Sequence, residues 1–207
     1  MECLMGIACN NFVMLAADMT KTQSILVMKN DEEKLFKLTD KMVMGVCGDS
    51  GDTSQFSEYI AKNIQLYKMR NGYSLSPSAA SNFTRRNLAD YLRSRTPYNV
   101  NLLLGGYDDA TDEFQLYFCD YLASLVKIPY AVHGFGGHFC LSIMDRLHRK
   151  DLSIEEGYDI LTKCVQEIHK RVVINLPNFR VQVVTRDGIK NLEPITAARL
   201  ARESKDY

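Results

Sequence analysis

Long apolar segments, closely spaced cysteine pairs and an excess of charge of one sign are all missing from this sequence. No segment approaches the run of about 18 apolar residues that a membrane-spanning helix needs, so we expect a soluble protein. Lys and Arg together number 25, as do Asp and Glu. With no net field to attract nucleic acid or an anionic membrane, partners must be recognised through local surfaces.

The cysteines are spread singly along the chain, without a C-x-x-C pair. This spacing does not match the dense disulfide framework of a small secreted domain, so we expect reduced thiols in an intracellular compartment. Residues 1–11 include Glu2 and lack the basic segment of a signal peptide. The cysteines are Cys3, Cys9, Cys47, Cys119, Cys140 and Cys164.

Apolar sequence is plentiful: 46% of the 207 residues are hydrophobic, enough for one substantial core. Short apolar runs bounded by turn residues predict strands over 4–9, 12–18, 24–28, 34–38 and 42–48. Two helices are expected next, over 50–70 and 77–95. Ser50 or Asp52 would cap the first, and Ser76 the second.

In the second half of the chain, predicted strands are again followed by predicted helices. Strands are expected over 100–107 and 114–124, then a helix from the glycine-rich turn at 134–137 to about Arg146. The capping box formed by Ser153 and Glu156 predicts a further helix. Its apolar stripe is Ile154, Tyr158, Leu161, Val165, Ile168 and Val172.

A hairpin over 179–184 and 189–192 closes the predicted fold, and a polar tail follows over 196–207. We therefore expect an α+β protein with a single domain over 1–195. Two sheets that face each other, with helix pairs on their outer sides, would bury every apolar face. The predicted architecture is a four-layer αββα sandwich.

The string Gly48-Asp49-Ser50-Gly51 matches the sequence around the nucleophile of chymotrypsin-like serine proteases. Those enzymes place the general-base His upstream of the Ser, whereas all four histidines here, His133, His138, His148 and His169, lie downstream. We interpret the string as a turn from a strand into a helix.

His133, His138 and Cys140 are residue types that bind metals and lie close together in the sequence. A spacing of five residues on a helix swings two side chains apart, and a spacing of two places them nearly opposite, so no metal site is expected. The glycine-rich turn is also no phosphate loop, because G-x-G-x-x-G needs a glycine where Phe139 stands.

The densest basic cluster consists of Arg85, Arg86, Arg93 and Arg95. Together with Tyr91 and Tyr98 it could contact a nucleic-acid backbone. Asp90 lies four residues after Arg86 and three before Arg93, which favours a salt-bridged helix face or a subunit contact instead.

The segment over 63–108, NIQLYKMRNGYSLSPSAASNFTRRNLADYLRSRTPYNVNLLLGGYD, resembles the corresponding stretch of eukaryotic β-type subunits of the 20S proteasome. The strings FVMLAAD, VCGDSGD, HGFGG and NLPNFRVQVV fall in the family's order, and the similarity extends over about 3–195. The resemblance implies an N-terminal-nucleophile hydrolase fold, which agrees with the αββα arrangement expected above.

The resemblance also implies where a site should lie. In active members of the family, processing leaves a Thr as the first residue, and its hydroxyl attacks the peptide carbonyl. Asp18 and Lys34 match the family's supporting Asp and Lys, and Gly48 matches the glycine whose amide stabilises the oxyanion. The nucleophile position falls on Glu2, and no Gly-Thr processing junction precedes it.

Other parts of the family's active site are altered too. Phe135 stands where active relatives have a Ser, and residues 171–176 contain no Asp to match the second supporting carboxylate. Cys3, one position along the strand from Glu2, would point to the opposite face of the sheet from Lys34. We expect Glu2 to form an ion pair with Lys34.

The resemblance therefore implies a non-catalytic structural subunit of the 20S core β ring, which supports assembly of the chamber for ATP- and ubiquitin-dependent protein degradation. No catalytic residue, cofactor or metal is expected in this chain. The implied partners are β subunits beside it and across the two rings, and α subunits, in the cytoplasm and nucleus. The alternative is an active threonine- or cysteine-type peptidase subunit with an N-terminal nucleophile.

Overall fold

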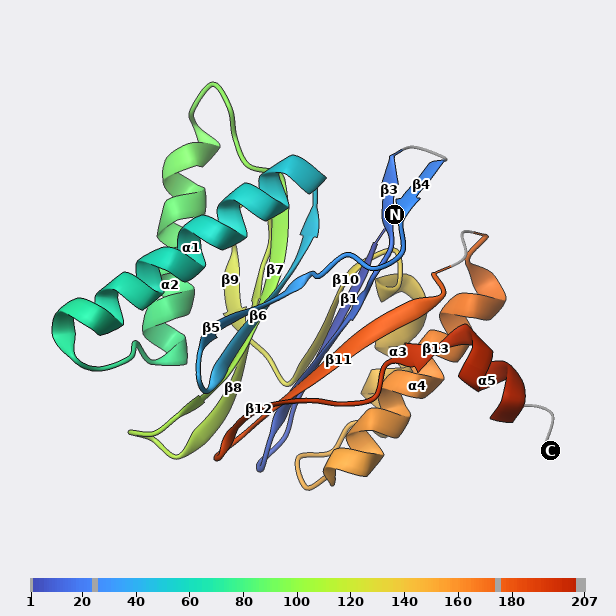
Figure 1. The fold of residues 1–207 in the computed structure, drawn as a ribbon. Coiled ribbons are helices and arrows are strands. Elements are labelled where there is room, and N and C mark those ends of the chain that lie inside the picture. The colour runs from blue at the N-terminus through green and yellow to red at the C-terminus, as the bar shows by residue number, and fades with distance from the viewer. Residues whose placement is uncertain (1, 24–25, 174–175, 204–207) are drawn as a thin grey trace.

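Two antiparallel β-sheets face each other in the computed structural model, which describes residues 2–23, 26–173 and 176–203 (Figure 1). The first sheet contains β1 (Cys3–Ala8), β2 (Val13–Asp18), β10 (Tyr130–Gly134), β11 (Asn178–Thr185), β12 (Gly188–Asn191) and β13 (Ile195–Thr196). The second contains β5 (Leu35–Thr39), β6 (Met42–Gly48), β7 (Val100–Asp108), β8 (Glu113–Cys119) and β9 (Leu125–Lys127). The strand orders are β10-β1-β2-β11-β12, with β13 on β11, and β5-β6-β7-β8-β9.

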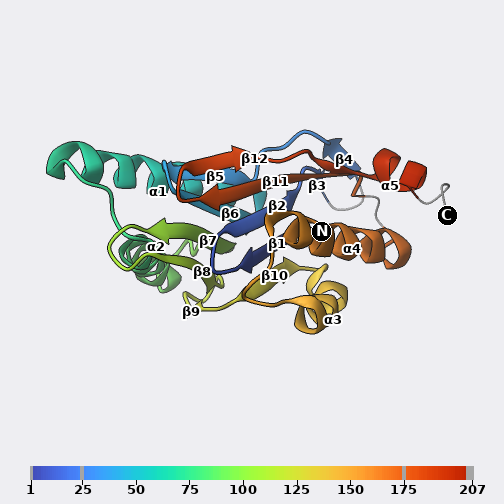
Figure 2. The same cartoon turned by 90° about the horizontal axis from the view of Figure 1, so that it is seen from below.

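Helix pairs cover the outer face of each sheet (Figure 2). The pair on the second sheet is α1 (Ser50–Asn71) and α2 (Pro77–Leu92), and the pair on the first is α3 (Gly137–Leu147) and α4 (Ile154–Arg171). A short α5 (Ala197–Glu203) follows β13 and packs Leu200 into the core beneath α4. The predicted αββα sandwich is therefore confirmed.

Three buried apolar clusters fill the spaces between these four layers. Because both faces of each sheet are covered, central strands such as β1, β2 and β6 are buried along almost their whole length. Successive residues of β1 enter different clusters: Leu4 packs between the sheets and Met5 packs against α3 and α4. None of the helices described is both long and apolar enough to cross a membrane.

The predicted capping residues are confirmed for two helices and wrong for a third. Ser76 caps α2, and Ser153 with Glu156 forms the predicted capping box of α4. The cap of α1 is Asp49, whose Oδ1 accepts the Gly51 amide at 3.1 Å. The prediction of Ser50 or Asp52 as that cap was wrong, because the helix already begins at Ser50.

The strand predictions missed four short strands, β3 (Lys21–Gln23), β9, β10 and β13. β3 pairs with β4 (Leu26–Lys29) in a separate hairpin, and residues 24–25 of the strand predicted over 24–28 lie outside the described residues. The strand predicted over 114–124 ends at Cys119, because the Asp120 carboxylate accepts the amides of Leu122 and Ser124 and turns the chain. β9 and β10 follow this turn and were not predicted.

Candidate functional site

Lys34 is the centre of a buried polar cluster between the two sheets. It precedes β5, and its side chain is 7% exposed. Nζ lies 2.9 Å from Asp18 Oδ2, 2.8 Å from the Thr20 carbonyl oxygen and 2.9 Å from Glu2 Oε1. An ammonium group has three protons, so these three acceptors satisfy all of them. The predicted ion pair between Glu2 and Lys34 is present.

Asp18 ends β2 and holds the cluster to the first sheet. Its Oδ1 accepts the Cys3 amide at 2.8 Å, and Oδ2 also accepts the Thr20 amide at 3.1 Å. Burial raises the pKa of Asp18, against the lowering effect of Lys34 and of the Cys3 amide. For Lys34, burial acts to lower the pKa, but the carboxylates of Asp18 and Glu2 outweigh it and the pKa is raised. Lys34 is therefore charged at neutral pH.

Glu2 also reaches Gly48, a contact that the sequence did not predict. Its Oε2 accepts the Gly48 amide at 2.5 Å, so the carboxylate bridges a backbone donor and the Lys34 ammonium. Gly48 ends β6 with φ +146°, and a Cβ added there would lie 2.2 Å from the Asn99 carbonyl oxygen. Only glycine fits this position without strain.

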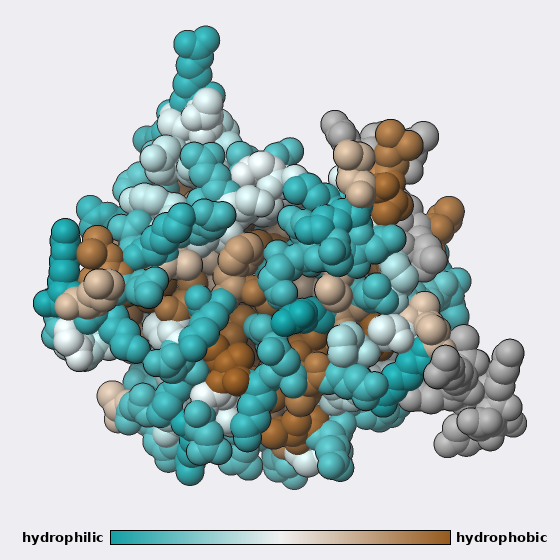
Figure 3. All heavy atoms as spheres, in the orientation of Figure 1, coloured by the Kyte–Doolittle hydropathy of each residue, from teal (hydrophilic) through white to brown (hydrophobic). Residues whose placement is uncertain are grey.

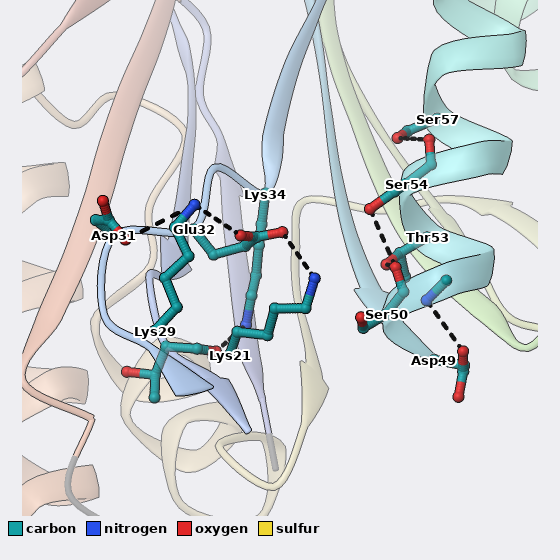
Figure 4. Close-up of polar contacts among 12 residues, drawn as sticks. Lys21, Lys29, Asp31, Glu32, Lys34, Asp49, Ser50, Thr53, Ser54 and Ser57 are labelled. Atoms are coloured by element: carbon teal, nitrogen blue, oxygen red, sulfur yellow. Dashed lines mark hydrogen bonds and ion pairs between the residues drawn. The ribbon is translucent and has the colours of Figure 1, made fainter. Parts of the chain in front are cut away.

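Little space remains beside the cluster. The cavity that adjoins Glu2 and Lys34 has a volume of about 20 Å³, which is room for a single water molecule. Lys21 and Glu32 form an ion pair of 3.5 Å at its rim. Figure 4 shows Lys34 close to this pair, opposite the first turn of α1.

Comparison with known proteins assigns the chain to a family. The family model described as "Proteasome subunit" matches residues 2–184. A probable proteasome subunit beta type-4 of Neurospora crassa is 46% identical over 193 residues, which is 93% of this chain and 95% of that protein. Proteasome subunit beta type-2-A of Arabidopsis thaliana is 44% identical, over 92% of this chain and 93% of its own length. Subunit beta type-4 of Saccharomyces cerevisiae is 42% identical, over 95% and 100%.

The chain belongs to the proteasome β-subunit family. The predicted resemblance, which was to eukaryotic proteasome subunit beta type-2, is confirmed, and with it the N-terminal-nucleophile hydrolase fold. The chain is a β-type subunit of the 20S core and assembles with other proteasome subunits into that particle.

In this β subunit the thiol of Cys3, the residue after Glu2, points away from the cluster. Cys3 is 1% exposed and packs under α3, where its Sγ would be 2.2 Å from a Cβ added at Gly136. A hydrogen bond with the Cys140 thiol and complete burial raise the pKa of Cys3 well above its ordinary value. The prediction that Cys3 faces away from Lys34 is confirmed, and a protonated buried thiol is a poor nucleophile.

Phe135 lies at the other end of the cluster, after β10. Its side chain is half exposed, and its amide donates to the Glu2 carbonyl oxygen at 3.2 Å. No hydroxyl is therefore supplied from this position. Of the segment 171–176, which lacks the second supporting Asp, residues 174–175 lie outside the described residues.

The histidines of the β subunit are engaged elsewhere. His133, His148 and His169 each form a hydrogen bond through Nε2 with a backbone carbonyl, of Leu102, Ala8 and Leu176 respectively. His138 lines a groove between α3 and α4. Over residues 2–23, 26–173 and 176–203 there is no group of three or more His, Cys, Asp and Glu side chains placed to bind a metal.

The basic cluster does not form the predicted salt-bridged face. Helix α2 ends at Leu92, so Arg93 is its C-cap and Arg95 lies beyond it. In the part of the chain that the structure describes, no ion pair joins Asp90 to Arg86 or Arg93. The ion-pairing prediction was wrong: Arg93 lies at the end of the helix, and Arg86 and Asp90, although both on α2, are exposed to solvent and do not pair.

Proposed function

We propose that this β subunit is a non-catalytic structural member of the β ring. The observation that carries the proposal is the position of Glu2. Its carboxylate forms an ion pair with the Lys34 ammonium and accepts a hydrogen bond from the Gly48 amide. In an active subunit those groups would assist the nucleophile and the oxyanion. A carboxylate is a poor nucleophile toward an amide, and here both of its oxygens already accept hydrogen bonds.

The alternative, a threonine- or cysteine-type peptidase subunit, needs a new first residue with a reactive side chain. Cys3 is the nearest such residue, but its thiol lies in the apolar layer beneath α3 and its pKa is raised. Thr20 is fully buried, and its own amide and carbonyl are tied to Asp18 and Lys34. Neither residue supports an N-terminal nucleophile.

In this proposal the subunit contributes surfaces instead of chemistry. It packs against β subunits beside it and in the opposite ring, and against α subunits, and so helps to seal the degradation chamber. Several large apolar side chains are exposed and suit such contacts, among them Met69 on α1 and Leu141 on α3. All six cysteines are free thiols, which supports our placement of the particle in the cytoplasm and nucleus.

The mature chain tests the proposal. Intact mass and N-terminal sequencing of this chain from the purified particle should give a chain that retains Glu2. An electrophilic peptide probe that modifies N-terminal nucleophiles should add mass to other β chains of the same particle, which serve as the positive control, and none to this one. A chain that begins at Cys3 or Thr20, or that carries the probe, would contradict the proposal.

A further inference from the structure

We propose that the Lys34 ammonium and the Gly48 amide form a binding site for a small carboxylate, and that the side chain of Glu2 is its tethered occupant. Each carboxylate oxygen takes one donor: Oε1 lies 2.9 Å from Lys34 Nζ, and Oε2 lies 2.5 Å from Gly48 N. The inference rests on the proposed function, because a side chain that takes part in no chemical step can occupy the site permanently.

Both donors are held in place by contacts that do not involve Glu2. Lys34 Nζ is fixed by Asp18 Oδ2 and by the Thr20 carbonyl oxygen, at 2.9 and 2.8 Å. Gly48 pairs with Val100 in the second sheet, and the following amide, of Asp49, donates to the Asn99 carbonyl oxygen at 3.0 Å. The donors should therefore keep their positions when the Glu2 side chain is shortened.

The arrangement of donors indicates the class of ligand. An ammonium and an amide that each bind one oxygen of a planar group match a carboxylate, and charge-assisted hydrogen bonds of this kind are short and strong. Without Glu2, one ammonium proton and one amide would lose their acceptors in a site that is largely closed to water, which is unfavourable. The space released, together with the adjoining cavity of about 20 Å³, suits formate or acetate.

The Glu2→Gly variant, made in the full chain and co-assembled with the other subunits, tests this site. Hydrogen exchange of the peptide that contains Gly48 is measured in the assembled particle, with sodium formate or sodium chloride at equal ionic strength. Formate at about ten times its dissociation constant should slow exchange about tenfold in the variant. Wild-type particles should not respond, and neither should Asp31→Asn, which removes a carboxylate whose side chain is 78% exposed.

A second variant separates binding at the site from a general effect of the anion. Glu2→Gly combined with Lys34→Met should lose the formate response, because the charged donor is gone. Equal exchange in formate and chloride for assembled Glu2→Gly particles would overturn the inference, as would a formate effect that survives in the double variant. If the single variant does not assemble, its incorporation is compared in the two salts. Rescue by formate alone then supports the site, and failure of rescue overturns it.

The two proposals fail in different ways. Peptide cleavage assigned to this chain would overturn the non-catalytic function and leave a formate response unaffected. A missing formate response, in particles whose chain retains its encoded start and carries no probe, would overturn only the carboxylate site.

Discussion

The Glu2 carboxylate accepts the Gly48 amide at 2.5 Å across 46 residues of sequence. Gly48 matches the family's oxyanion glycine, so the group that would stabilise a reaction intermediate is engaged by the chain itself. The same carboxylate satisfies the third proton of Lys34. In the proposed function, the residues that match the family's active site therefore serve to stabilise the fold.

Replacement of Lys34 should destabilise the subunit. Lys34→Ala would leave the carboxylates of Glu2 and Asp18 without their cation, and removal of one partner from a buried ion pair typically costs about 3–5 kcal/mol. Hydrogen exchange of this chain's peptides in the assembled particle would report the loss. Lys37→Ala is the control: its ion pair with Asp40 is 2.7 Å long but about two-thirds exposed, so the cost should be about 1 kcal/mol or less. Loss of one cleavage specificity with unchanged stability would contradict this assignment.

Substitution by alanine at two nearby glycines should change the stability of the subunit in opposite directions. Gly48→Ala places a methyl group 2.2 Å from the Asn99 carbonyl oxygen at a φ of +146°, so we expect a cost of about 3 kcal/mol and displacement of the Gly48 amide. Gly51→Ala lies in the first turn of α1, with its nearest contact at 3.5 Å, and should stabilise the helix by up to about 1 kcal/mol. Exchange rates of the α1 peptides in both variants measure the difference. Equal effects would show that the strain at Gly48 is unimportant.

His133 should make the subunit sensitive to acid. Its ring is stacked on Phe118 at 4.0 Å between the sheets, and burial lowers its pKa to about 4, against the opposing effects of the Leu102 carbonyl and Asp120. In the unfolded chain the pKa of His133 is about 6.5, so below that pH only the unfolded chain gains this proton. The stability present above pH 6.5 is therefore lost as the pH falls to about 4, by about 3 kcal/mol in total.

The pH dependence can be assigned with one substitution. His133→Asn keeps a hydrogen-bond donor but cannot titrate, so its exchange protection should fall less between pH 6.5 and pH 4 than that of the wild type. His138→Asn, on the outer helix layer, serves as the control. Identical pH profiles for the wild type and His133→Asn would rule out this source of acid sensitivity.

The subunit expressed alone should self-associate. The β3–β4 hairpin carries Leu26, Val27 and Met28, all more than half exposed, and Figure 3 shows apolar side chains standing out from the surface at its upper right. A two-stranded hairpin is only marginally stable without a partner, and subunit contacts usually bury more than about 1,000 Å². Size-exclusion chromatography should show aggregates for the lone chain and a much larger complex on co-expression. A stable 23.6 kDa monomer that never enters the complex would contradict this expectation.

Most of the architecture followed from sequence periodicity, because long helices and continuous apolar strands carry strong signals. The short β9 and β10 carry weak ones, and their strand character depends on pairing with β8 and β1. The pairing of Lys34 with Glu2 followed from family spacing. The contact from Glu2 to Gly48 could not be predicted, since it depends on how closely the two sheets approach.

The polar cluster also fixes how one sheet is aligned on the other. Glu2 and Asp18 flank strands of the first sheet, whereas Lys34 and Gly48 flank strands of the second. The apolar side chains between the sheets would tolerate a small sliding motion, because dispersion and hydrophobic contacts have little directionality. A shift of one residue, about 3.3 Å, would break the contacts that cross between the sheets, those of Lys34 with Asp18, Thr20 and Glu2 and that of Gly48 with Glu2. Glu2, Asp18, Lys34 and Gly48 thus set the relative position of the two layers.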